Sequence, residues 1–498
     1  IGNSAFYDCS SMTSISIPKS VTSIGEGAFQ GCSSLTSIEI PSSVTSIGVF
    51  AFKSCGSLTS INIPGSVTSI GNGAFAGCGK LTSIEIPSNV ESIGELAFSN
   101  CTVLTSITIP KSVASVGDKA FSGCIALKEV LLEGGSTLTS KNLGVDENII
   151  KTYWNEGDLT WTLDAEGTMT ISGSGAMKVY SADDSPAYNN SNIKKVVIAN
   201  GITSIGDHAF SGCTNLTDVT IPESVTSIGD SAFSGTAWLT SKQKDNPLVI
   251  VNGILIDGTA CSGEVTIPDD VTKIGSSAFL NCTGLTNVTI PKSVTSIGSS
   301  VFDGCTALTE VLLENGSTLT YNDLGVNESQ IATYWSEGDL TWTLDAEGTM
   351  TISGSGEMKS YLIPDSPATQ KKDSVNKVVI QEGVTSIGEG AFFNCTGLKS
   401  IEIPEGVKSI GDSAFSKCTD LTSIVIPEGV TSIGAYAFLG CSSLTSIEIP
   451  SSVTSIGENA FYNCTGLTSI NIPEGVTSIG SSAFGYCSSL TSITIPKS

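Results

Sequence analysis

Apolar side chains recur with a fixed spacing of 23 residues along most of this 498-residue chain. The working repeat is C-x-x-L-T-S-I-x-I-P-x-x-V-T-S-I-G-x-x-A-F-x-x. It occurs fifteen times, centred on Phe6, Phe29, Phe52, Phe75, Phe98, Phe121, Phe210, Phe233, Phe279, Phe302, Phe392, Phe415, Phe438, Phe461 and Phe484. Cys follows the Phe by three positions in every copy except one, where Thr236 holds that place. Such a short period means that the repeats must be interpreted before any domains are assigned.

Each repeat contains two short segments with strand character. In LTSIEI at 35–40, the final apolar residues alternate with polar ones, as in a strand with one buried face. The Pro that follows ends this strand because it cannot donate to a β ladder. VTSIG at 44–48 supplies a second extended piece, and its Gly permits the bend that brings Ala51 and Phe52 inward. Each repeat is therefore predicted to form one coil with two β faces.

One coil cannot cover its own apolar side, so the repeats are expected to stack. Stacking buries roughly six side chains per repeat, each contributing about 1.5–3 kcal/mol before the entropy cost is counted. The segment CSSLTSIEIPSSVTSIG occurs identically at 32–48 and at 441–457. Most of its letters face inward or turn the chain in this scheme, so the copy is a stacking unit and not a duplicated active site. The predicted fold is mainly β, an elongated solenoid of 23-residue coils with small β insertions.

Two long segments interrupt the period. Residues 133–192 and 314–374 are two versions of one β insert and are called here the first and the second insert. Both contain LTWTLDAEGTMTIS, which alternates with period two around a Gly-bearing turn and therefore predicts a hairpin.

A shorter interruption lies at 237–263. It carries Asn252-Gly253 between two apolar runs, which is a strong hairpin signal, and it contains Cys261, out of register with the other fourteen cysteines. The predicted repeat blocks are accordingly 1–132, 193–313 and 375–498. Both ends of the chain fall inside a repeat, so we expect it to be a fragment of a longer protein.

The unit CSSLTSIEIPSSVTSIGEGAF resembles the leucine-rich repeat of bacterial surface antigens known as BspA-like or Treponema pallidum-type repeats. The resemblance covers about two thirds to three quarters of the chain, and no Asn occupies the ladder position that other leucine-rich repeats use. It implies a bacterial protein at the cell surface or secreted, and a ligand among host matrix or plasma proteins, other bacteria or glycans. Two alternatives remain open: a spacer that binds nothing itself, and an enzyme acting on carbohydrate.

The charge balance argues against several other classes of function. The chain has 48 acidic residues and 23 basic ones, all Lys, for a net charge of −25. Nucleic-acid binders depend on basic patches and on Arg forks, so no nucleic-acid partner is expected. No run of 18 apolar residues is present, so no membrane insertion is predicted for this chain. We expect a monomer.

The cysteines form a comb with the period of the repeat. Metal sites require clustered ligands and disulfide frameworks belong to short loop-rich domains, so a buried column of free thiols is predicted, with no metal and no cofactor. The predicted columns are Cys9, Cys32, Cys55, Cys78, Cys101 and Cys124, and then Cys395, Cys418, Cys441, Cys464 and Cys487.

Catalytic groups are scarce. The only His, His208, occupies an ordinary repeat position, which disfavours His-dependent hydrolysis and phosphotransfer. Asp164 with Glu166, and Asp345 with Glu347, form the only notable carboxylate pairs, and an Asp at the start of a turn is expected to cap the backbone. The chain is therefore predicted not to be an enzyme.

The best candidates for binding are residues that differ between copies and point outward. In L-T-S-I-x-I, the x position forms a row along one sheet, where leucine-rich solenoids usually present their binding face. The predicted contact residues are Glu39, Asn62, Glu85 and Thr108 in the first block, Glu402, Glu448 and Asn471 in the last block, and Trp154 and Trp335 in the inserts. Tyr153 and Tyr334 are stacking candidates beside these Trp residues, whereas Trp161 and Trp342 alternate in phase with hairpin core positions. Drift on a solvated surface is the alternative explanation for the variation along this row.

Overall fold

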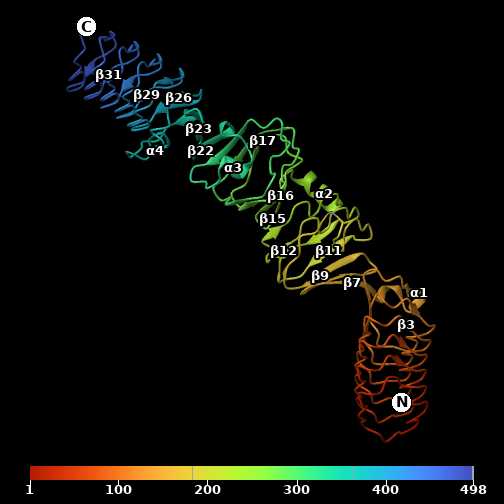
Figure 1. Ribbon diagram of the computed structural model, residues 1–498. Coiled ribbons are helices and arrows are strands. Elements are labelled where there is room, and N and C mark those ends of the chain that lie inside the picture. Colours follow the sequence, from red (N-terminus) through yellow and green to blue (C-terminus); the bar gives the residue numbers. More distant parts are fainter. Residues whose placement is uncertain (182, 363, 496–498) are drawn as a thin grey trace. The chain divides into compact units, whose positions relative to one another are not determined.

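The computed structural model describes residues 1–181, 183–362 and 364–495. It divides into two compact units, Ile1–Asn246 (unit 1) and Pro247 onward (unit 2). Each unit is a mainly β solenoid whose coils follow one another at about 23 residues, so the predicted fold class is confirmed. Figure 1 shows the stacked coils within each unit.

Unit 1 contains three parallel or mixed sheets. The VTSI segments form two ladders, β1 (Ser46–Ile47), β2 (Ser69–Ile70), β3 (Ser92–Ile93) and β5 (Ser115–Val116), and then β10 (Gly175–Ala176), β12 (Ile202–Ile205) and β14 (Ser227–Ile228). The second face is one seven-stranded sheet in the order β13 (Asp218–Thr220), β11 (Lys195–Ile198), β9 (Thr168–Gly173), β8 (Leu159–Leu163), β7 (Ile150–Glu156), β6 (Glu129–Glu133) and β4 (Ser106–Ile109). Helix α1 (Ser140–Leu143), the 3-10 turn η1 (Glu147–Ile149) and helix α2 (Ala237–Asp245) complete the unit.

Unit 2 repeats this plan. Its VTSI ladders are β15 (Val249–Val251), β16 (Ile254–Asp257), β18 (Lys273–Ile274) and β20 (Ser296–Ile297), and then β25 (Gly356–Glu357), β27 (Val384–Ile387), β29 (Ser409–Ile410), β30 (Ser432–Ile433), β31 (Ser455–Ile456) and β33 (Ser478–Ile479). The other face has eight strands in the order β17 (Gly263–Thr266), β19 (Leu285–Ile290), β21 (Glu310–Glu314), β22 (Ile331–Glu337), β23 (Leu340–Leu344), β24 (Thr349–Gly354), β26 (Lys377–Ile380) and β28 (Ser400–Glu402). Strands β32 (Ser469–Asn471) and β34 (Ser492–Thr494), helices α3 (Tyr321–Leu324) and α4 (Pro367–Gln370), and the 3-10 turn η2 (Glu328–Gln330) are the remaining elements.

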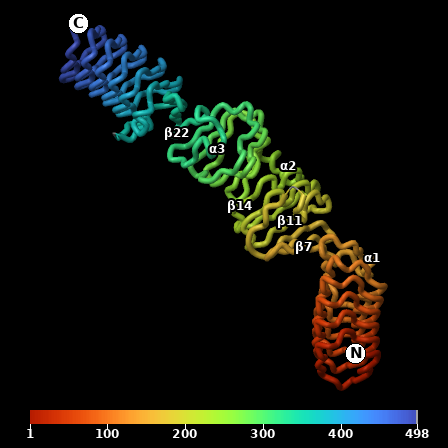
Figure 2. The backbone as a smooth tube through the Cα atoms, in the orientation of Figure 1, coloured from red at the N-terminus to blue at the C-terminus, as the bar shows by residue number. Residues whose placement is uncertain are grey.

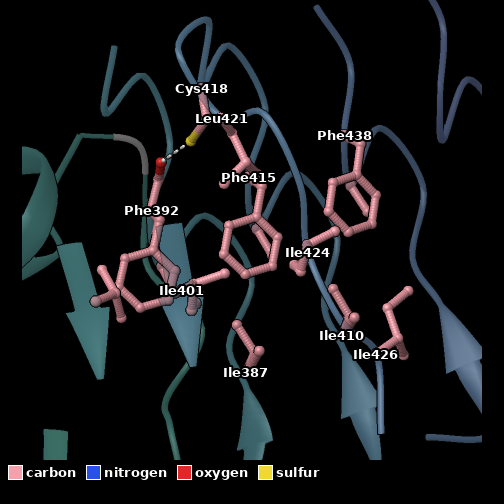
Figure 3. Close-up of a cluster of buried hydrophobic side chains, with 14 of the residues drawn as sticks. Ile387, Phe392, Ile401, Ile410, Phe415, Cys418, Leu421, Ile424, Ile426 and Phe438 are labelled. Atoms are coloured by element: carbon pink, nitrogen blue, oxygen red, sulfur yellow. Dashed lines mark hydrogen bonds between the residues drawn. The ribbon is translucent and has the colours of Figure 1, made fainter. Parts of the chain in front are cut away.

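The repeat letters form continuous columns in the core. The Phe rings of successive coils stack with centroids 5.3 Å apart between Phe29 and Phe52 and 5.4 Å apart between Phe392 and Phe415. The Phe29 amide donates to the Ala51 carbonyl of the next coil at 2.8 Å. A backbone hydrogen bond therefore joins the turns that carry the Phe rings in neighbouring coils. Figure 3 shows Phe392, Phe415 and Phe438 in one such column, with Ile side chains below them.

Both inserts continue the solenoid sheet and do not form separate bodies. In the first insert, β7 pairs parallel with β6, the three strands β7, β8 and β9 form an antiparallel meander, and β9 pairs parallel with β11. The antiparallel pairing of β8 with β9, which sets Trp161 opposite Ile171, confirms the predicted hairpin. The pairing of β7 with β8, which sets Trp154 opposite Trp161, was not predicted. The VTSI ladder, in contrast, stops at β5 and resumes only at β10.

The segment around 237–263 contains helix α2, which was not predicted from the sequence. Thr236, which replaces Cys in this one copy, is the N-cap of α2 and accepts a hydrogen bond from the Leu239 amide at 3.1 Å. Trp238 packs on Phe233 with ring centroids 4.7 Å apart and is buried. The indole thus extends the aromatic column beyond Phe233, and the Trp238 amide donates to the Leu216 carbonyl at 2.7 Å. Figure 2 shows where α2 lies along the chain.

The predicted Asn252-Gly253 hairpin is confirmed. Strands β15 and β16 pair antiparallel, and Asn252 and Gly253 have φ values of 50° and 73°, as the tight hairpin turn requires. Strand β16 also pairs parallel with β18, so this hairpin supplies the VTSI segment of the first coil in unit 2.

Candidate binding surface

The predicted outward row exists as a physical row in each unit. Parallel bridges join Glu39 to Asn62 and Glu85 to Thr108 in unit 1. In unit 2, bridges join Val425 to Glu448 and Glu448 to Asn471. The side chains at Glu39, Asn62, Glu85, Glu402, Glu448 and Asn471 are exposed, and Thr108 is half-buried. Val425 leaves 77% of its surface in solvent, so one apolar residue interrupts the acidic row of unit 2.

In unit 1 the row ends at a groove formed by the first insert. This Tyr153 groove has a volume of about 520 Å³ and lies on the outward face of the seven-stranded sheet. It is lined by Ser83, Ile84, Glu85, Ser106, Ile107, Thr108, Leu131, Tyr153, Asn155 and Thr160. Two residues of the predicted row, Glu85 and Thr108, therefore share one concave surface with residues of the insert.

Strand alternation explains which insert residues reach the groove. Along β7, Tyr153 and Asn155 lie on one face of the sheet and Trp154 on the other. Tyr153 is paired with Glu133 of β6, and Asn155 with Thr160 of β8, whose hydroxyl donates to the Asn155 amide oxygen at 3.2 Å. The groove thus combines a phenol and an amide of β7 with a hydroxyl of the neighbouring strand β8.

The electrostatics of the groove are negative. Burial raises the pKa of the Tyr153 phenol, and the nearby Glu133 and Glu85 carboxylates raise it further. In unit 2, burial together with Glu314 and Asp269 raises the pKa of Tyr334 to about 12. Both phenols therefore stay protonated at neutral pH and can donate a hydrogen bond.

The two predicted Trp contacts lie on the opposite, core side of the sheet. Trp154 is half-buried, and its indole N–H has no hydrogen-bond partner in the described part of the chain. Trp335 is only 8% exposed and donates from Nε1 to Gln370 Oε1 at 3.4 Å. Trp335 has too little exposed surface to contact a ligand. Asn155 and Thr160, which were not predicted, could have been found from the period-two patterns of IKTYWNE and LTWTL.

The cysteines line the interior beside the Phe column. A typical thiol, Cys55 Sγ, donates to the Phe29 carbonyl at 3.2 Å, which satisfies it inside the core. All fifteen cysteines are free. Burial raises the pKa of most of the thiols in the columns, to about 12 for Cys78, Cys395 and Cys464. These groups are packed, protonated and poorly suited to act as nucleophiles.

Two cysteines depart from the pattern of the others. Cys261, out of register in the sequence as predicted, is buried beside the column, and its carbonyl accepts from Cys282 Sγ at 2.9 Å. The coil between them is two residues shorter, with Gly258 at the position of the usual Phe, which is why the register seemed lost. Cys9 is exposed because no coil of the described chain covers its outer side, and Cys124 and Cys487 are half-buried.

The Asp of each carboxylate pair stabilises the hairpin turn of its insert. Asp164 Oδ1 accepts a hydrogen bond from the Thr168 amide at 2.7 Å, and Asp345 Oδ1 accepts the equivalent bond from Thr349 at 2.7 Å. Within residues 1–181, 183–362 and 364–495, no group of three or more His, Cys, Asp or Glu side chains is arranged to hold a metal ion. In the same residues, no helix is both long and apolar enough to cross a membrane.

A family model for the BspA type leucine-rich repeat region matches six times, over residues 1–128, 184–252, 258–331 and 366–491. The chain belongs to the BspA-type leucine-rich repeat family. The matched ranges leave out most of the first insert and the middle of the second. The predicted resemblance is therefore confirmed.

Solved structures similar to this BspA-type chain include bacterial leucine-rich repeat proteins. One from Bacteroides ovatus is 26% identical, with 97% of this chain and 92% of that chain covered and a TM-score of 0.23. A leucine rich cell surface protein from Faecalibacterium prausnitzii is 25% identical, with 95% and 88% covered and a TM-score of 0.22. A leucine-rich repeat protein from T. pallidum is 27% identical, with 33% and 83% covered and a TM-score of 0.28. A search of curated proteins gave no match.

Proposed function

We propose that this chain is a non-enzymatic binding module of a bacterial cell-surface or secreted protein, and that it binds a protein or a glycan of a host or a neighbouring cell. Membership of the BspA-type family supports a binding role. The observation that carries the proposal is the meeting of the Glu39–Thr108 row with the Tyr153 groove on one face of unit 1.

The chemistry of this face favours a ligand with hydrogen-bond donors. The Glu39 and Glu85 carboxylates accept hydrogen bonds, and Asn62 and Asn155 both donate and accept them. Tyr153 adds an aromatic ring with a protonated hydroxyl, which is the kind of side chain that anchors interfaces. A basic segment of a protein, or a hydroxyl-rich glycan, fits this combination.

The test uses the full chain on an array of matrix proteins, plasma proteins, mucins and glycans. Tyr153→Ala and Glu85→Lys are each expected to weaken the main signal at least tenfold, because both side chains line the same groove. Tyr334→Ala is the matched control in unit 2, where Thr266 and Ser336 stand at the positions of Glu85 and Asn155, and it should leave binding within twofold of the wild type.

A full chain that binds nothing on the array would favour the alternative role of a spacer. Binding that persists in both groove variants, but is lost on charge reversal of Glu402 and Glu448, would move the site to unit 2. These outcomes separate the proposed role from the proposed location.

A further inference from the structure

A second cavity opens on the core side of the first insert. This insert pocket has a volume of about 610 Å³, within the range of about 300–1,000 Å³ that is common for small-molecule sites. Its lining comprises Leu132, Glu133, Ser136, Leu138, Thr139, Ser140, Glu147, Ile150, Thr152, Leu163, Asp164, Ala165, Gly167, Ser191, Asn192, Lys194 and Asn215. Strand alternation puts it on the opposite face of β7 and β8 from the Tyr153 groove.

The pocket exists because only one of the two sheets passes through the insert. The VTSI ladder ends at β5 and resumes at β10, so no strand of the described residues faces the inward side of β6 to β8 between them. The connecting segment covers only the first core: Leu138 and Leu143 are buried there with the preceding coils. The half-buried Leu163 consequently contributes apolar surface to an open cavity, beside Leu132 and Ile150 at the edge of the first core.

Polar groups around this apolar surface fall into two sets. One set is occupied structurally: Asp164 Oδ1 accepts from Thr168, and Asn215 Nδ2 donates to the Ser191 carbonyl at 2.8 Å. The other set comprises Ser140, Glu147 and Lys194, whose side chains have no hydrogen bond or ion pair to any described residue. Three unengaged groups of different character, a hydroxyl, a carboxylate and an ammonium, therefore line one cavity.

We propose that the insert pocket binds a neutral saccharide. Sugar hydroxyls can donate to the Glu147 carboxylate and accept from the Lys194 ammonium, while Ser140 can do both. The C–H face of a pyranose ring can pack on Leu138 and Leu163. The Glu147 and Asp164 carboxylates outnumber the single cation Lys194, so an acidic sugar is repelled.

The second insert supplies a matched comparison. Tyr321 stands at the position of Ser140, Asn376 at that of Lys194, and Gly397 at that of Asn215. The Asn376 amide donates to the Glu347 carbonyl at 2.6 Å, so it is tied to the hairpin turn. These three residues are compatible with the fold because the second insert forms the same meander with them.

The test measures the full chain on an array of neutral and acidic glycans, followed by calorimetry with each soluble glycan bound. The triple variant Ser140→Tyr, Lys194→Asn and Asn215→Gly carries the second insert's own residues. It is expected to fold, to keep its unfolding temperature within about 2 °C, and to bind neutral glycans at least tenfold more weakly. Lys372→Ala, which removes an exposed ion pair outside both cavities, should leave this binding unchanged. Tyr153→Ala is measured in parallel and reports on the groove, because Tyr153 lies on the other face of the sheet.

Three results would overturn the proposal: no neutral glycan bound, binding restricted to acidic glycans, or equal binding by the triple variant and the wild type. Loss of neutral-glycan binding in Tyr153→Ala but not in the triple variant would assign that binding to the groove instead.

Discussion

In the first insert, Trp154 is half-buried and its indole N–H is unpaired within the described residues, whereas in the second insert Trp335 is 8% exposed and bonded to Gln370. The strands that carry both Trp residues have nearly the same sequence, from YWNEGDLTWTLDAEGTMTISGSG to YWSEGDLTWTLDAEGTMTISGSG. The difference arises outside the strands, in the segment before the next coil. Unit 2 has α4 there, and Gln370 of α4 reaches back to both Trp335 and Asn315.

The buried side chains of the two inserts, by comparison, make nearly the same contacts. Trp161 meets Tyr180 edge-on at 6.0 Å and 88°, and Trp342 meets Tyr361 at 6.0 Å and 89°. In each copy the Tyr hydroxyl donates to the Glu that ends the first strand of the meander, Glu156 of β7 or Glu337 of β22. The inserts therefore share a core and differ at the surface, which is where different ligands would be recognised.

The largest expected difference between the two units is the loss of stability at alkaline pH in the coils that follow each insert. Residues 193–246 contain one cysteine, Cys213, whereas residues 375–498 contain five, of which Cys395, Cys418, Cys441 and Cys464 are buried. Burial raises the pKa of Cys213 to about 11 and those of Cys395 and Cys464 to about 12, and it raises those of Cys418 and Cys441 well above the usual value of 9.0.

Raising the pH should therefore unfold the later coils first. The unfolded chain loses its thiol protons above pH 9 while the folded chain keeps them, so each buried thiol stabilises the fold fully below pH 9 and less as the pH rises. The slope is about 1.4 kcal/mol per pH unit for each thiol, hence roughly 5 kcal/mol for four thiols and about 1.4 kcal/mol for one. Urea unfolding at pH 8 and pH 10 under reducing conditions, followed by pulse proteolysis and peptide mapping, measures both segments.

The matched control for this prediction is the double variant Cys418→Ala with Cys441→Ala. It should halve the pH slope of residues 375–498 and leave that of residues 193–246 unchanged. Equal alkaline loss in the two segments would show that the thiols are not held protonated by burial.

The second prediction concerns the shared core. Trp161→Ala and Trp342→Ala each remove a fully buried indole and leave a cavity, so each should cost about 3–5 kcal/mol in its own unit. The two costs should agree within about 1 kcal/mol, because the Tyr contacts of the two indoles match. Hydrogen exchange of peptides from β8–β9 and β23–β24 reports each unit separately. Trp154→Ala, at a half-buried position, is the control and should cost less than either.

The third prediction tests the contact that distinguishes the inserts. Gln370→Ala removes the acceptor of the Trp335 indole and should cost about 1 kcal/mol. The Trp335 Nε1 proton should then exchange with solvent faster, as NMR of the indole region would show. Lys372→Ala, which removes only the exposed pair with Asp373, should leave that signal unchanged. Slow exchange in Gln370→Ala would mean that burial alone protects Trp335.

The solenoid could be predicted because every coil carries the same signal. The apolar positions of LTSIEI and VTSIG, the Phe column and the Asn252-Gly253 turn are local patterns, and stacking identical units leaves only one way to bury them. Helix α2 was missed because its reason is tertiary. A nine-residue helix with only Trp238 buried has almost no amphipathic pattern, and it forms where an indole can cover the end of the Phe column.

The candidate site was only partly predictable for a similar reason. Glu39, Asn62, Glu85 and Thr108 follow from strand alternation within single repeats. The Tyr153 groove, however, depends on how β7 pairs with β6, across a connection that includes α1. Trp154 and Trp335 were predicted contacts because an aromatic ring can stack on a ligand, but alternation places both on the core side. The insert pocket likewise requires knowing that the VTSI ladder stops at β5.

The smallest expected effect concerns one ion pair on the outward face. In the first insert, Lys151 Nζ lies 2.7 Å from Glu129 Oε1, with both side chains about one third exposed. In the second insert Ala332 replaces this Lys, and the equivalent Glu310 accepts instead from Asn287 Nδ2 at 3.0 Å. Lys151→Ala should therefore cost only about 0.2–1 kcal/mol, and less at high salt.

Ser106→Asn, added to Lys151→Ala, recreates the arrangement of the second insert, because residue 106 pairs with Glu129 as Asn287 pairs with Glu310. The double variant should recover most of the lost stability and, since a neutral amide replaces the ammonium, should no longer respond to salt. Urea unfolding at low and high salt measures both effects. If the double variant stays as unstable as Lys151→Ala, the two inserts are not interchangeable at this face. The side chains on β4 and β6 would then be placed differently from those on β19 and β21, although the strands pair in the same register.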